Sequence, residues 1–125
     1  MPVTKTQLKD YVQLFVPTKD RQGRSLPPAT IHLWQGKIED VFRHFVRGFY
    51  VSPYYTLSGN FLSSDVGWME EPNYVIKAFA PREVCESLLR ALEAEVIEPM
   101  ILALDQESIA VESTLEGLVL YEVHR

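Results

Sequence analysis

The sequence predicts a single α+β domain that contains an antiparallel sheet and two helices. Apolar residues recur with helical spacing in two stretches, residues 30–47 and 81–105. β-Branched and aromatic residues gather in the stretches around them, as is typical of strands. The elements therefore follow the order β-α-β-β-α-β, with a short extra strand before the last. This is the ferredoxin-like order, in which two helices cover one face of the sheet and the other face stays open.

The 125-residue chain has the length of one domain, so we expect residues 1–125 to fold together. Residues 1–9 are polar and should be loosely attached. The first strand, residues 11–16, is apolar at nearly every position, which favours a central place in the sheet. It is followed by residues 18–28, a loop that is long for a connection between a strand and a helix.

The two predicted helices each have one apolar face. In the first helix, residues 30–47, Trp34 and Ile38 lie on that face, and charged residues lie opposite. The second helix begins at Pro81 and carries an apolar row at spacings of four residues. Pro99 cannot donate a backbone hydrogen bond, so we expect this helix to end near Glu98 or to bend there and continue to about residue 105.

The remaining segments predict strands. Residues 49–62 contain a proline, which places them at the sheet edge with a break near Pro53 or Gly59. Residues 68–80 return as the next strand after a turn at 63–67. At the end of the chain, residues 108–112 and 118–123 predict a terminal hairpin.

Composition excludes several classes of protein. The net charge of −5 and the pI near 5.1 have the wrong sign for non-specific binding to nucleic acid. No apolar run approaches the roughly 20 residues that a membrane span needs. The single cysteine cannot form an internal disulfide, and the first residues lack the apolar region of a secretion signal, so we expect a cytoplasmic protein. No His, Cys, Asp and Glu spacing predicts a metal site, and no motif predicts a cofactor.

Three basic residues, Lys19, Arg21 and Arg24, lie in the 18–28 loop. Together with the start of the following helix they could bind an anionic small molecule. The alternative is a solvated loop without a ligand.

Two residues are weak candidates for acid–base catalysis. His44 follows Asp40 by one helical turn, which would let the carboxylate orient the imidazole. Glu71 lies with Asp65 and Glu70 around the predicted edge hairpin. The alternatives are a solvated polar pair for His44 and charges that protect a sheet edge for Glu71.

Aromatic residues gather around the same hairpin and could line a pocket or an interface; they are Tyr54, Tyr55, Trp68 and Tyr74. Packing in the core is the alternative. The strands at 11–16 and 74–79 are apolar on both faces, and helices can cover only one of them. We therefore expect a second copy of the chain to cover the open face, as a homodimer or a larger oligomer.

The preferred functional hypothesis is a non-catalytic binding or regulatory module that acts as a homo-oligomer and binds an anionic ligand through the 18–28 loop. The absence of a catalytic motif disfavours an enzyme. The first alternative is a small dimeric enzyme with an aromatic-lined pocket. The second is a structural domain for protein–protein interaction.

Overall fold

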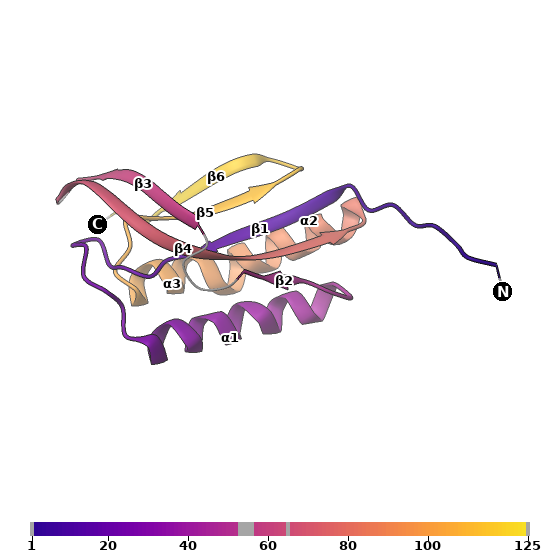
Figure 1. The fold of residues 1–125 in the computed structure, drawn as a ribbon, viewed down its shortest axis with the longest axis horizontal. Helices are drawn as coiled ribbons and strands as arrows, with labels where there is room; N and C mark the ends of the chain where they lie inside the picture. Colours follow the sequence, from indigo (N-terminus) through magenta and orange to yellow (C-terminus); the bar gives the residue numbers. More distant parts are fainter. Residues whose placement is uncertain (1, 53–56, 65, 125) are drawn as a thin grey trace.

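The fold is described from a computed structural model, in which residues 2–52, 57–64 and 66–124 are placed. The elements are β1 (Asp10–Val16), α1 (Pro28–Phe45), β2 (Tyr50–Val51), β3 (Leu57–Ser63), β4 (Gly67–Ala80), α2 (Arg82–Leu92), the π-helix η1 (Glu93–Ile97), α3 (Glu98–Ala103), β5 (Ser108–Ser113) and β6 (Gly117–Glu122). Figure 1 shows the helices on one side of the sheet.

The sheet is antiparallel throughout, with strand order β2-β4-β1-β5-β6, and β3 pairs with β4. This confirms the predicted ferredoxin-like order with an extra strand at the end. β1 is central as expected, since it pairs with β4 on one side and with β5 on the other. The terminal hairpin of β5 and β6 is also confirmed.

The core lies between the sheet and the helices. Val12, Leu14 and Val16 of β1 are fully buried and alternate with partly exposed residues. Leu14 pairs with Ile76 of β4, which is also fully buried. Because side chains alternate along a strand, one face of the sheet becomes apolar and attracts the helices, while the residues between point to the open face.

Helix α1 begins two residues earlier than the sequence predicted. Pro28 stands at its first position, where the missing N–H is not needed, and Pro27 precedes it. The buried side chains of α1 include Ile31, Trp34 and Ile38, which confirms the predicted apolar face.

The second helix continues past Pro99, so the prediction of an end near Glu98 was wrong and the prediction of continuation was correct. Residues Glu93–Ile97 form a π-helical turn, and α3 then extends to Ala103. The wider turn ends at Ile97, two residues before Pro99, whose missing N–H interrupts the regular pattern of backbone hydrogen bonds. Glu93 accepts a hydrogen bond from the Tyr121 hydroxyl at 2.6 Å, which ties this turn to β6.

The hairpin of β3 and β4 extends beyond the rest of the sheet (Figure 1). The seven residues from 74 to 80 of β4 pair with β1, and residues 67–73 pair with β3. The predicted edge segment 49–62 is therefore divided into β2 and β3. A break near Gly59 was wrong, because Gly59 pairs with Glu71 inside β3. Pro53 lies outside the described residues.

Truncation of the core should destabilise the fold strongly. Leu88 of α2 is fully buried, so we expect Leu88→Ala to lower the free energy of unfolding by about 2–5 kcal/mol. Ser87→Ala changes the exposed neighbouring residue and should cost less than about 1 kcal/mol. Urea unfolding followed by circular dichroism measures both values, and equal losses would contradict the packing described here.

Candidate functional site

A cavity of about 320 Å³ lies on the open face of the sheet, at the end where the β3–β4 hairpin begins. We call it the open-face cavity. Its apolar lining includes Phe15 of β1, Ala110 of β5, and Leu118 and Leu120 of β6. These residues alternate along their strands with the residues that face the helices. The polar lining residues are Arg21, Asn60, Glu71, Asn73, Gln106, Glu107 and Ser108.

Glu71 is the most unusual residue of the open-face cavity. The residue is only 5% exposed. One carboxylate oxygen, Oε2, accepts a hydrogen bond from the backbone N–H of Lys19 at 3.0 Å. Burial raises the pKa of Glu71 from 4.5 to about 7, although the backbone N–H groups of Lys19 and Thr18 and the Lys19 charge favour the ionised form. A carboxyl group that titrates near neutral pH can serve in acid–base chemistry or bind a cation.

Gln106 holds the loop after β1 beside Glu71. Its side-chain amide donates hydrogen bonds to the carbonyl oxygens of Lys19 at 2.6 Å and of Leu104 at 3.0 Å. The preceding residue, Asp105, has a φ of 49°, and this left-handed turn allows the chain to pass from α3 into β5. The Arg21 N–H donates to the Asp105 carbonyl oxygen at 2.8 Å, so the two loops support each other.

The 18–28 loop is ordered by its own hydrogen bonds. Asp20 Oδ1 accepts from the backbone N–H groups of Gln22 and Arg24, both at 2.9 Å. Gly23 has a φ of 82°, and an added Cβ would meet the Met69 sulfur at 3.3 Å. Glycine therefore lets the loop turn tightly against β4. The loop forms a fixed wall at this end of the sheet.

The three basic residues of this loop point to different partners. Arg24 forms an ion pair with Asp20, with Nε 3.0 Å from Oδ2. The Lys19 ammonium donates to the Glu70 carbonyl oxygen at 3.2 Å. Of the three, Arg21 lines the open-face cavity together with Glu71. The structure thus brings together one of the predicted anion-binding residues and one of the predicted catalytic residues.

The other predicted site residues lie elsewhere. His44 is exposed on α1, where its ring contacts Phe45 edge-on at 5.0 Å between centroids. Tyr74 is 1% exposed in the core, and its hydroxyl donates to the Ile31 carbonyl oxygen at 3.5 Å. Trp68 is 76% exposed on the β3–β4 hairpin. Tyr54 and Tyr55 lie outside the described residues.

Sequence reasoning missed Gln106, Asn60 and Asn73. Gln106 belongs to a short polar run, DQES, that follows an apolar helix and precedes a strand. A polar run at such a junction is a signal for a site at a sheet edge, but it does not reveal that the glutamine is buried. Among residues 2–52, 57–64 and 66–124, no three His, Cys, Asp or Glu side chains are grouped to hold a metal ion.

Within the same residues, no helix has both the length and the apolar character of a membrane span.

Comparison with known proteins gives no matching protein family and no matching curated sequence. Two solved structures are similar over nearly the whole chain. One is a phage SAM lyase in complex with S-methyl-5'-thioadenosine, with 15% identity, a TM-score of 0.60 and 97% coverage of each chain. The other is a phage SAM lyase in the apo state, with 13% identity, a TM-score of 0.60 and 98% coverage of each chain. The fold is shared with an enzyme.

This likeness corrects the functional prediction. A non-catalytic module was preferred because the sequence carries no catalytic motif, and a non-enzyme was expected for the same reason. The structures that share the fold are those of an enzyme, which favours the alternative of a small enzyme with a pocket. At these identities the likeness itself extends to the fold only.

Glu71 should make stability depend on pH. Its pKa of about 7 in the folded state exceeds the unfolded value of 4.5, so the folded state binds more protons between these pH values. Its contribution to the free energy of unfolding therefore falls as pH rises from 4.5 to 7. We expect Glu71→Gln to be more stable than the wild type by about 1–3 kcal/mol at pH 8.

The two proteins should have similar stability at pH 4.5. Glu70→Gln is the matched control, because it removes a carboxylate from the exposed neighbouring position. Thermal or urea unfolding at several pH values measures these differences. A constant difference between Glu71→Gln and the wild type would show that Glu71 titrates normally.

Proposed function

We propose that the protein is a small lyase that cleaves a sulfonium compound of the S-adenosylmethionine type in the open-face cavity. The observation that carries the proposal is a carboxyl group, Glu71, that is 5% exposed and has a pKa near 7 in a partly apolar cavity. The likeness to SAM lyase over nearly the whole chain supports this choice of reaction. Such a substrate is an intracellular metabolite, so the predicted cytoplasmic location forms part of the proposal.

The reaction removes the positive charge of the sulfonium sulfur. When the bond from the sulfonium sulfur to the amino-acid chain breaks, its electron pair stays on sulfur and neutral S-methyl-5'-thioadenosine leaves. In the same step the amino-acid fragment either transfers a proton from the neighbouring carbon to the ionised Glu71 carboxylate and becomes an alkene, or forms a bond from its own carboxylate oxygen to the carbon that sulfur leaves and becomes a lactone. A cavity with apolar walls favours the loss of the sulfonium charge, because it solvates the cation less well than water does.

The lining residues have complementary charges for this substrate. The ionised Glu71 carboxylate would bind a positive group, and the bound cation would in turn lower the pKa of Glu71. The Arg21 guanidinium is suited to bind the substrate carboxylate. Phe15 and Leu120 offer apolar surface to the nucleoside. The cavity volume falls in the range of small-molecule sites.

Turnover of S-adenosylmethionine tests the proposal. Purified protein should release S-methyl-5'-thioadenosine, which chromatography with mass spectrometry detects, and the same run identifies an unsaturated or a lactone product. Glu71→Gln should lower kcat/KM by about 100-fold, because it removes the negative charge from the cavity. Glu70→Gln should change kcat/KM by less than about 2-fold. Absence of the thioether above the uncatalysed rate would refute the proposed reaction.

The pH dependence of turnover tests the role of Glu71 separately. Because the ionised form is required, kcat/KM should rise from pH 5.5 to 8 with a midpoint near the free-enzyme pKa of about 7. The residual activity of Glu71→Gln should lack this midpoint. If the variant keeps the same midpoint, another group controls the reaction.

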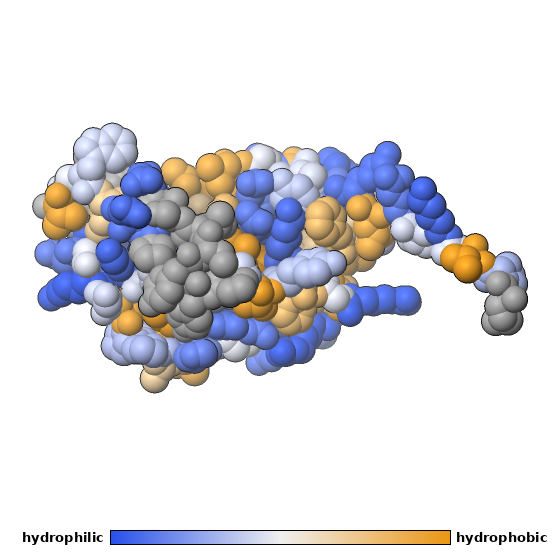
Figure 2. Space-filling model, viewed as in Figure 1, coloured by the Kyte–Doolittle hydropathy of each residue, from blue (hydrophilic) through white to orange (hydrophobic). Residues whose placement is uncertain are grey.

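Self-association through the open face stays a prediction, and two exposed leucines support it. Leu118 is 61% exposed and Leu120 is 57% exposed on β6. Figure 2 shows apolar surface along the upper edge, where Figure 1 places β5 and β6. We propose that a second copy covers this surface and closes the open-face cavity. Light scattering should give at least the mass of a dimer, and Leu120→Glu should lower it; a monomeric wild type would contradict the proposal.

A further inference from the structure

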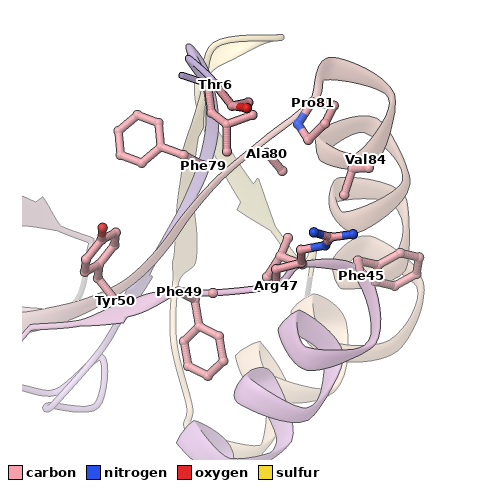
Figure 3. Close-up of a pocket in the computed structure, with 12 residues that line it drawn as sticks. Thr6, Phe45, Arg47, Phe49, Tyr50, Phe79, Ala80, Pro81 and Val84 are labelled. Carbon is pink, nitrogen blue, oxygen red and sulfur yellow. The ribbon is translucent and has the colours of Figure 1, made fainter. Parts of the chain in front are cut away.

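A second and larger cavity, of about 650 Å³, lies at the other end of β4 (Figure 3). Its walls come from the end of α1 and the following link, from the end of β4, from the start of α2, and from the segment before β1. It shares no lining residue with the open-face cavity. The proposed lyase reaction makes no use of it. We call it the α1–α2 cavity.

The walls of the α1–α2 cavity are mostly apolar and rich in aromatic rings. Phe45, Phe49, Tyr50 and Phe79 line it, and Val84 lines it from α2. The rings of Phe79 and Tyr50 lie across β4 from Arg47, and the Lys77 ammonium is 5.0 Å from the centre of the Phe79 ring, so Phe45 and Val84 provide the apolar surface beside Arg47 (Figure 3). Flat aromatic walls favour a flat apolar ligand, because stacked and edge-on ring contacts add to the hydrophobic effect.

One lining residue carries a charge, Arg47, in the link after α1. In the view of Figure 3 its guanidinium group lies between Val84 and the ring of Phe45. Other arginines near this end of the molecule are paired: Arg43 with Glu39 at 3.0 Å, and Arg82 with Asp10 at 3.5 Å. In the described part of the chain, Arg47 forms no ion pair. A cation without a carboxylate, beside apolar walls that weaken screening, attracts an anion strongly.

We propose that the α1–α2 cavity binds an organic anion with a flat apolar body about as large as one or two aromatic rings. Phe45 and Val84, which lie beside Arg47 in Figure 3, hold the body, and Arg47 binds the carboxylate or sulfonate through its fork of N–H donors. This site is separate from the proposed lyase site: it lies at the Ala80 end of β4, whereas Glu71 and Asn73 line the open-face cavity from the middle of the strand.

Two fluorescent probes of similar shape test the site. 1-Anilinonaphthalene-8-sulfonate is an anion, and N-phenyl-1-naphthylamine is its neutral counterpart. Arg47→Gln should weaken binding of the anionic probe by about 10-fold or more, since it removes a charge-assisted contact. The same variant should change the affinity of the neutral probe by less than about 2-fold.

A side chain that fills the cavity should lower the affinity for both probes. Gly48 lines the cavity, its φ is not positive, and an added Cβ would meet no heavy atom within 4 Å. Gly48→Phe is therefore expected to fold and to reduce binding of both probes by about 10-fold. Circular dichroism and the melting temperature confirm that each variant is folded.

Two matched variants control for charge. Lys9→Gln removes an exposed cation close to the cavity that does not line it, and Arg21→Gln removes the cation of the open-face cavity. Neither should change binding of the anionic probe by more than about 2-fold. The proposal is overturned if Arg47→Gln leaves the affinity for the anionic probe unchanged, or if it lowers the affinity for both probes equally. It is also overturned if folded Gly48→Phe binds both probes with the wild-type affinity. The same holds if Arg21→Gln lowers the affinity for the anionic probe by the factor expected of Arg47→Gln.

Discussion

The pairing of β1 with β4 is the interaction on which most of the molecule depends. It joins seven residues of each strand, with Leu14 opposite Ile76. A slip of one residue would turn every buried side chain of β1 toward the open face. The correct register places the apolar face against α1 and α2 and leaves Phe15 and Glu71 on the other side. The core and the open-face cavity are thus consequences of a single strand register.

The same register explains why Glu71 lowers the stability of the folded protein at neutral pH. It stands on the part of β4 beyond the end of β1, where the 18–28 loop folds over it and excludes water. The loop replaces the lost water with backbone N–H groups from Lys19 and Thr18, but these only partly offset the burial of a charge. A protein that keeps a carboxyl group in such a place gives up stability at neutral pH. A loss of stability of this kind is common at active sites.

Much of the fold could be predicted from the sequence, because helical spacing and the alternation of strands are local patterns. Leu88 and Leu92 lie on the buried face that their spacing predicted, and the last two strands pair as expected. The site was harder to predict. Glu71 could be named as a candidate, but its burial depends on Lys19 and Gln106, which are distant in sequence. The preference for a non-catalytic module failed because it rested on the lack of a sequence motif, whereas the likeness to an enzyme is visible only in the fold.

The π-helical turn at Glu93–Ile97 affects how this chain aligns with a related sequence. A π-turn contains one residue more than an α-turn of the same helix, while the segments on both sides keep their packing. An alignment with a relative whose second helix is regular should therefore place a one-residue gap between Glu93 and Ile97. A gap placed instead in the loop after α3 would misalign the buried residues Met100 and Ile101 of α3.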